Sequence, residues 1–328
     1  MKRIGFLYDK ICSVANLIEA DNKARKGKGR TKGILKHDAQ RGANILTLHN
    51  ALMNGEYRTS EYSTFKVYEH KERIVYNLPH YPDRIVHHAI MNYLEDIFVS
   101  VFTNDSYASI KGRGTHKAVD NLKNDLRDHN ATQFYVKMDI TKFYPSIDHD
   151  IVKAQLRRKI KDARLLALLD EIIDSAEGLP IGNYLSQYLS NLYLSGLDHW
   201  LKEQKGVKHY YRYADDMLIL GATKAELHAL RAEIMAYLRN NLKLEMKGNY
   251  RVAPSATGID YLGYVVYPKY TMLRKRNKQA FARTLKRNAS RSTIASYVGM
   301  AKHCNSRHLL KTFKLTHEQI QRPKHRTR

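Results

Sequence analysis

Hydrophobic residues recur at helical spacing in several long stretches of the chain. Within residues 84–102 the apolar side chains lie at steps of four, at Ile85, Ala89, Tyr93 and Ile97, which predicts a helix with one buried face. The same kind of pattern predicts four further helices, over 117–129, 151–173, 183–201 and 223–241. In the last of these, Thr223 and Glu226 form an S/T-x-x-E capping box, which marks where the helix begins.

Shorter runs rich in β-forming residues predict strands between these helices. Residues 133–140 predict one strand, which ends at Asp139, and residues 260–268 predict another, which ends at Pro268. Residues 209–220 place two aromatic or aliphatic runs around Ala214, Asp215 and Asp216, which predicts a β-hairpin. A sheet that carries acids at one edge and is covered by helices gives the α+β fold class.

The charge of the chain is strongly positive and unevenly spread. Lys and Arg number 56 against 32 Asp and Glu, a net charge of +24, which favours nucleic acid or an anionic membrane surface as partner. Residues 270–328 hold 16 Lys or Arg and one acid, Glu318. Apolar residues recur in that segment and predict small basic helices with a buried side: Phe281, Leu285, Ile294, Tyr297, Val298, Leu309 and Leu310. The Gly-rich basic run 23–33 is either a solvated, flexible tail or part of a binding surface.

Several classes of protein are excluded by simple features of the sequence. No apolar run approaches the roughly 20 residues that span a bilayer, so no membrane partner is expected. Asp9 and Lys10 interrupt the apolar N-terminal stretch, which argues against a signal peptide. Cys12 and Cys304 lie far apart and offer neither a disulfide framework nor a cysteine zinc site. We expect a reducing, cytoplasmic setting.

Two adjacent acids, Asp215 and Asp216, stand among tyrosines and aliphatic residues. An unpaired carboxylate in such surroundings costs several kcal/mol, so a cation is expected nearby. If the strand that ends at Asp139 is a neighbour of the hairpin, the three carboxylates converge. Oxygen ligands and phosphate substrates suit Mg²⁺, and two such ions about 3.5–4 Å apart serve phosphoryl transfer. The alternative is that the acid pair is only a turn.

The tetrad Tyr213-Ala214-Asp215-Asp216 resembles the Y-x-D-D box of reverse transcriptases. Over roughly 70–268 further blocks resemble this family in the right order: DRIVHHAIMNYLEDIF, SYASIKGRGTHKAV, VKMDITKFYPSIDH, IGNYLSQYLSNLYL, LKLEMK and YLGY. The resemblance implies a right-hand polymerase, with fingers and palm in 1–268 and a small basic helical thumb in 269–328. It implies an RNA-directed DNA polymerase that uses two Mg²⁺ ions, dNTPs, a template RNA and an RNA/cDNA duplex.

The resemblance also assigns roles to single residues. Asp139 and Asp215 are implied metal ligands, Asp216 a ligand or close electrostatic partner, and Ile140 a member of the metal site. Tyr144 falls where the family has a bulky residue beneath the incoming sugar, which favours deoxynucleotides; the alternative is a core aromatic.

Three basic residues complete the implied nucleotide site. Lys71 and Arg73 precede Pro79 near the place where family members grip the triphosphate, although the spacing matches poorly. Lys247 matches the basic residue that follows the palm helix.

One departure from the usual family pattern is informative. Most members read Gln-Gly-x-x-x-Ser-Pro in the helix block, whereas this chain has Ile181 and Gly182 at the start and Gln187 at the end. Ile181 removes an amide near the nascent base pair, a hydrogen bond worth roughly 0.5–1.5 kcal/mol, so we expect it to contribute to infidelity.

The variant block is similar to that of the reverse transcriptases of diversity-generating retroelements, including bacteriophage ones. This subgroup implies error-prone copying of a template-repeat RNA at adenines, followed by replacement of a variable region of a target gene. It also implies a small oligomeric accessory variability protein and the cytoplasm of a bacterial host.

Two alternatives remain open. One is a group II intron-type reverse transcriptase or maturase, against which the Ser186-Gln187 ending and the 60 residues after Pro268 argue. The other is an RNA-binding scaffold with a degenerate polymerase fold, against which the complete set of acids argues.

Overall fold

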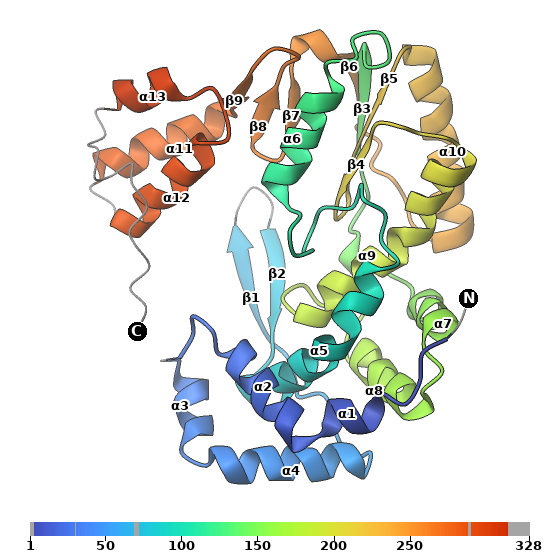
Figure 1. Ribbon diagram of the computed structural model, residues 1–328, viewed down its shortest axis with the longest axis vertical. Helices are drawn as coiled ribbons and strands as arrows, with labels where there is room; N and C mark the ends of the chain where they lie inside the picture. Colours follow the sequence, from blue (N-terminus) through green and yellow to red (C-terminus); the bar gives the residue numbers. More distant parts are fainter. Residues whose placement is uncertain (1–2, 30, 69–71, 288–289, 314–328) are drawn as a thin grey trace. The chain divides into compact units, whose positions relative to one another are not determined.

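The computed structural model describes residues 3–29, 31–68, 72–287 and 290–313 (Figure 1). The chain divides into two compact units. The first comprises Met1–Ile110, Asp139–Gly206 and Glu233–Gly248, and the second comprises Lys111–Met138, Val207–Ala232 and Asn249–Arg328.

The first unit is built mainly of helices, with the hairpin of β1 (Ser63–Tyr68) and β2 (Glu72–Asn77) as its named strands in the described residues. Its helices are α1 (Tyr8–Cys12), α2 (Val14–Ala24), α3 (Lys32–Asp38), α4 (Arg41–Met53), the π-helical turn η1 (His80–Arg84), α5 (Ile85–Val99), the 3₁₀ turn η2 (Tyr144–Ser146), α7 (His149–Lys159), α8 (Ala163–Asp174), α9 (Tyr184–His199) and the π-helical turn η3 (Trp200–Gln204). Helix α9 is buried along most of its length. Its buried Asn191 donates to the carbonyl of Ala108, which is distant in the chain, at 2.8 Å.

The single helix predicted over 151–173 is wrong, because the chain breaks between α7 and α8. Asp162 accepts a hydrogen bond from the Leu165 amide at 3.3 Å and so caps α8. Its other carboxylate oxygen accepts from the amides of Leu7 and Tyr8 at 2.8 and 3.0 Å. Burial alone would raise the pKa of this carboxyl, but these amides lower it overall. One aspartate therefore organises two helix starts, which helical periodicity cannot reveal.

The second unit contains two antiparallel sheets. The first has the strand order β4-β5-β3-β6, made of β3 (Phe134–Asp139, whose last residue belongs to the first unit), β4 (Tyr210–Tyr213), β5 (Asp216–Gly221) and β6 (Arg251–Pro254). The second sheet has the order β7-β8-β9, with β7 (Ile259–Tyr261), β8 (Tyr264–Val266) and β9 (Thr271–Leu273). Helix α6 (Thr115–Asp125) contacts β4 and β8, and a 3₁₀ turn, η4 (Ser255–Thr257), precedes β7. The mixed α/β composition with antiparallel sheets confirms the predicted fold class.

The hairpin and the helix predicted after it are confirmed. Helix α10 (Lys224–Leu242) begins after Thr223, whose hydroxyl accepts from the Glu226 amide at 3.2 Å. The single strand predicted over 260–268 is wrong, because Leu262 and Gly263 have φ values of 47° and 90° and reverse the chain between β7 and β8. A φ of 90° at Gly263 strains a residue with a Cβ, so the turn favours glycine.

The predicted basic helices near the C-terminus are confirmed over the described residues. Helices α11 (Lys275–Lys286), α12 (Arg291–Ala301) and α13 (Arg307–Thr312) enclose a cluster around Phe281, Ile294 and Val298. Four further apolar residues pack against it: Leu285, Tyr297, Leu310 and Phe313. The predicted Leu309 is not part of that cluster.

The basic run 23–33 is not a free tail where the structure describes it. Lys23 lies in α2 and pairs with Glu19 at 2.7 Å. Arg25 pairs with Asp21 and Asp38, both at 2.7 Å, and so ties the end of α2 to α3. Among the described helices, none is long and apolar enough to cross a membrane.

Candidate active site

The turn that carries the acid pair is a two-residue hairpin loop. Tyr213 pairs with Asp216, which leaves Ala214 and Asp215 between the strands. Ala214 has a φ of 54°, the sign that such a loop requires at its first position and one that is costly for a residue with a Cβ. The fully buried Arg212 donates to the Ala214 carbonyl at 3.3 Å. The buried guanidinium of Arg212 therefore stabilises the turn.

An ion pair links the hairpin to the neighbouring strand of its sheet. Lys137 of β3 places its Nζ 3.3 Å from Asp216 Oδ2 at the start of β5, and β3 and β5 are adjacent in the sheet. Side chains two residues apart on a strand share a face, so Lys137 and Asp139 leave β3 on the same side. The first residue of β5 thus lies beside the end of β3, where Asp139 is the last residue.

Within the first unit, Asp139 is held by the segment that follows α10. The Lys247 amide donates to the Asp139 carbonyl at 2.9 Å, and the Thr141 amide donates to the Glu245 carbonyl at 2.8 Å. Between them Ile140 is fully buried and bridges Met246. The Lys247 ammonium forms a close ion pair with Asp139 Oδ2. These contacts bring together the predicted residues Asp139, Ile140 and Lys247.

The other oxygen of Asp139 decides whether a cation suits this residue. Oδ1 is buried and makes no hydrogen bond to any described residue. A buried carboxylate oxygen without a donor is costly unless a cation supplies the missing interaction. Hard divalent ions prefer such oxygen ligands. The donor set at Asp139 therefore fits a divalent metal.

Lys137 was missed by the sequence reasoning, although its spacing from Asp139 on one strand face could have identified it. Besides pairing with Asp216, its ammonium donates to the carbonyl of Asp260 in β7 at 3.1 Å. The Asp260 carboxylate in turn accepts from Arg274 at 2.6 Å, directly before α11. A polar chain therefore runs from the acid pair to the first of the basic helices.

Tyr144 lies at the start of η2, close to the loop before α9. Its hydroxyl accepts from Ser190 Oγ at 3.3 Å, and its carbonyl accepts from the Leu179 amide at 2.9 Å. A Cβ at Gly178, whose φ is 59°, would lie 2.3 Å from that carbonyl. The ring is half-buried, so it is not enclosed as a core aromatic would be.

The loop that carries Ile181 and Gly182 is fixed by β2. The Tyr76 amide donates to the Ile181 carbonyl at 2.8 Å, and a Cβ at Gly182 would lie 2.4 Å from the Tyr76 carbonyl. Gln187 is exposed on α9. Arg73 is exposed on β2, whereas Lys71 lies outside the described residues.

A second cluster of titratable groups, also missed, centres on Asp21 in the first unit. Its carboxylate is fully buried and accepts from Arg25, from Arg41 at 2.6 Å and from His80 at 2.7 Å. His37 Nε2 lies 3.6 Å away. Ligand atoms of Asp21 and the two histidines are close enough together to hold an ion. Two guanidinium groups already use both oxygens, so the cluster is an ion-pair network and does not suit a metal.

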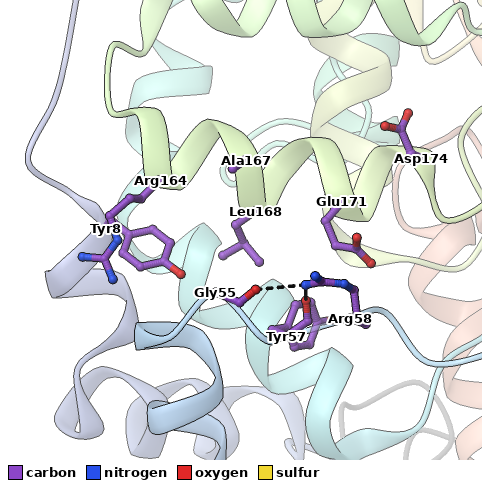
Figure 2. A pocket seen from close by; sticks show the side chains of 9 residues that line it. All are labelled: Tyr8, Gly55, Tyr57, Arg58, Arg164, Ala167, Leu168, Glu171 and Asp174. Carbon is purple, nitrogen blue, oxygen red and sulfur yellow. Dashed lines mark hydrogen bonds between the residues drawn. The ribbon is translucent and has the colours of Figure 1, made fainter.

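A cavity of about 430 Å³ is lined by residues of α1, the loop after α4 and α8, and Figure 2 shows their side chains. Its charged groups already have partners. Arg58 donates to the carbonyls of Gly55 and Tyr57 at 3.0 and 2.7 Å, and Arg164 lies 4.2 Å from the Tyr8 ring centroid. Glu171 accepts from the Thr59 amide at 3.1 Å. These contacts brace the cavity wall.

Comparison with protein families gives the decisive match. The model of the family "Reverse transcriptase (RNA-dependent DNA polymerase)" matches residues 66–266. The chain belongs to the reverse transcriptase family. Members of this family use divalent metal ions, in agreement with the oxygen donors at Asp139. Its enzymes are RNA-directed DNA polymerases, and this confirms the predicted enzyme class.

Curated relatives of this reverse transcriptase include intron-encoded proteins. It is 27% identical over 272 residues to Protein YkfC of Escherichia coli, covering 68% of this chain and 70% of that protein. It is 22% identical over 282 residues to the group II intron-encoded protein LtrA of Lactococcus lactis, covering 63% of this chain and 47% of LtrA. The reverse transcriptase thus spans about half the length of LtrA.

The fold is shared with telomerase. Apo telomerase from Candida tropicalis superposes with a TM-score of 0.50 at 11% identity, covering 80% of this chain and 56% of the telomerase chain. The similarity supports the predicted right-hand polymerase fold.

Proposed function

We propose that this reverse transcriptase extends a DNA strand on an RNA template with Asp139, Asp215 and Asp216 as its metal-binding carboxylates. The ion pair between Lys137 and Asp216 carries the proposal, because it puts the hairpin turn beside the end of β3. Lys137 and Asp139 share a face of that strand. On this proposal, Asp139 acts together with the acid pair.

The remaining residues are assigned from this arrangement. Two Mg²⁺ ions held there would supply activation of an attacking hydroxyl and stabilisation of a leaving pyrophosphate. Ile140, fully buried, fixes the backbone beside Asp139. Tyr144 is proposed to exclude a 2′-hydroxyl and so select dNTPs over ribonucleotides.

The basic residues have two proposed tasks. Lys71, Arg73 and Lys247 neutralise the phosphates of the incoming dNTP. Residues 269–328 form the thumb and residues 1–268 the fingers and palm, and the basic face of α11 contacts the RNA/cDNA duplex.

Primer extension tests the polymerase assignment. The parent and an Asp215→Asn, Asp216→Asn variant are compared with Mg²⁺ and the four dNTPs on an RNA template. We expect extension by the parent alone, while both proteins bind RNA equally without metal. If the variant extends primers at the parent's rate, Asp215 and Asp216 are not needed for catalysis. If both proteins bind RNA and neither extends a primer, the result favours the RNA-binding scaffold.

Within the family, we propose the error-prone role of a diversity-generating retroelement. The feature that supports it is Ile181, a side chain without a hydrogen-bonding group where most members have glutamine. Gly182 and Gln187 complete the variant block. The enzyme would copy a template-repeat RNA with errors at adenines for retrohoming into a target gene, with an oligomeric accessory protein, in a bacterial cytoplasm.

Substitution at Ile181 tests this role with little risk to the loop. The Ile181 carbonyl is fixed by the Tyr76 amide at 2.8 Å, so an Ile181→Gln change alters the side chain on a constrained backbone. We expect sequenced cDNA from the parent to carry errors opposite adenine and the variant to carry several-fold fewer. Leu185→Met, a buried position on α9, is the matched control.

The similarity to LtrA favours a second function, that of an intron-type reverse transcriptase. The same sequencing separates the two. An accurate parent whose error spectrum does not change with Ile181→Gln would support the intron-type interpretation.

A further inference from the structure

A small basic cavity in the first unit takes no part in the chemistry described above. It measures about 80 Å³ and is lined by side chains from three segments, the loop after α2, the η1–α5 region and the start of α9. The lining groups that matter are Lys28, Arg84, His87, His88, Asn183 and Tyr184.

The charged side chains that line this cavity are both cationic. Lys28 and Arg84 both line it, and none of the described residues in its wall is acidic. Partial desolvation, followed by the charge of Arg84, lowers the pKa of Lys28. Two cations held near each other without a carboxylate favour an anion between them.

A buried imidazole also lacks a partner there. His87 is 1% exposed, and its Nε2 makes no hydrogen bond to any residue that the structure describes. Unsatisfied buried polar atoms are costly. The next residue, His88, stacks on Tyr184 with ring centroids 4.6 Å apart. This contact holds the His88 imidazole at the cavity wall.

Helix α9 directs its N-terminus at the same cavity. The helix has 16 residues, and its N-cap residue Asn183 makes no side-chain cap. The first amides of a helix have no partners within the helix, and together with the dipole they attract anions. The cavity is therefore lined by three features that suit an anion: the cations Lys28 and Arg84, the His87 imidazole without a partner, and the N-terminus of α9.

The lining of the cavity limits the anion. A nucleotide triphosphate brings a metal ion, and none of the described residues that line this cavity has a carboxylate to share it. A single phosphate, which brings no metal ion, suits this lining.

We propose that the cavity binds one backbone phosphate of the polynucleotide on which the enzyme acts. The inference rests on the proposed polymerase function, because that function supplies the polynucleotide. The site fixes the nucleic acid against the start of α9, where Gly182 also lines the cavity, and it shares no residue with the metal-binding acids.

Binding experiments with neutralised linkages test the site. The full chain, without divalent metal, is titrated with single-stranded RNA that carries a methylphosphonate at one linkage at a time. We expect one linkage at which the neutral group weakens binding of the parent about three- to tenfold. In Lys28→Gln that linkage has no further effect, because the ammonium that meets the phosphate is already absent.

Salt dependence gives an independent measure. For a single strand, the slope of log affinity against log salt falls by about 0.7 for each phosphate that the protein no longer neutralises, so Lys28→Gln lowers it by about that amount. Lys36→Gln, an exposed lysine on α3, is the matched control and leaves the slope unchanged. Thermal melting confirms that both variants fold.

Three results would overturn the proposal. In the first, the loss of RNA affinity caused by Lys28→Gln and the loss caused by the methylphosphonate add up at every linkage. The second is unchanged RNA affinity with a raised KM for dNTPs, which would assign the cavity to the nucleotide. The third is a parent that does not bind RNA. If the parent extends primers but shows no such coupling, only the cavity assignment fails and the polymerase stands.

Discussion

Two carboxylates in this protein have opposite surroundings. Asp21 is fully buried, and both of its oxygens accept hydrogen bonds from Arg25, Arg41 and His80. The side chain of Asp139 is 37% exposed; one oxygen meets Lys247, and the other has no hydrogen bond within the described residues. The first carboxylate is saturated by the protein itself, whereas the second has capacity for another cation.

This contrast shows why proximity of ligand atoms is a weak guide to function. Ligand atoms of Asp21, His37 and His80 lie close enough for a metal, yet two guanidinium groups would repel it. At Asp139 a single lysine pairs with one oxygen and leaves the other, which is buried, without a donor. An unsatisfied oxygen is therefore a better reason to propose a metal-binding acid than the mere closeness of ligand atoms.

Removing the carboxylate at Asp139 is the strongest way to test this difference. We expect Asp139→Asn to lower primer extension by about a thousandfold or more, because metal stabilisation of transition-state charge is worth several kcal/mol. Its free energy of unfolding should stay within about 1 kcal/mol of the parent, since this ion pair is partly exposed. A variant that retains activity would contradict the assignment.

The same substitution at Asp21 should have the opposite result. Asp21→Asn removes the charge of a fully buried carboxylate from its partly exposed partners Arg25 and Arg41, and breaking a buried ion pair costs about 3–5 kcal/mol. Chemical denaturation measures that loss. The fraction that remains folded should extend primers at the parent's rate, and a loss under about 1 kcal/mol would show that the network does not stabilise the fold.

Acid unfolding should distinguish the buried histidine His87 from the buried carboxylate Asp21, because each loses its contribution to stability in a different pH range. Burial, with smaller contributions from His88 and Arg84, lowers the pKa of His87 to about 3. The unfolded chain binds protons near pH 6.5, so stability falls as the pH drops below about 6.5, by up to about 1.4 kcal/mol per unit from this group. Denaturation curves of His87→Phe should be flatter than those of the parent between pH 6.5 and 4.5.

Asp21 acts in a lower pH window. Burial alone would raise the pKa of the Asp21 carboxyl, but the donors His80, Arg25 and Arg41 hold this pKa well below its usual range. A depressed native pKa gives stability that is present above about pH 4 and is lost as the pH falls further. An identical pH dependence for Asp21→Asn and the parent below pH 4 would contradict this.

The smallest effect concerns the lysines beside the acids. Lys137 and Lys247 each occupy one carboxylate, so Lys137→Gln and Lys247→Gln should tighten Mg²⁺ binding. Pairs of this exposure are worth roughly 0.2–1 kcal/mol, which corresponds to at most a fivefold change in a calorimetric titration. Lys269→Gln, an exposed lysine after β8, should leave the metal affinity unchanged.

Much of the architecture follows from local patterns. Helical periodicity located α5, α9 and α10, and the alternation around Asp215 located the β4–β5 hairpin with its correct turn. These elements were predictable because residues close together in the sequence form their hydrophobic faces and caps. The breaks at Asp162 and Gly263 were missed, because distant partners and positive φ values create them.

By itself the sequence determined the family and predicted most of the helices, the hairpin and the acids that we propose as metal ligands, because these depend on residue type and spacing. Only the tertiary structure decided which charges meet. It paired Lys137 with Asp216 and Lys247 with Asp139, saturated Asp21, and placed Lys28 and Arg84 around the start of α9. Such pairings join residues far apart in the chain, and their energies depend on burial and geometry that no local pattern records.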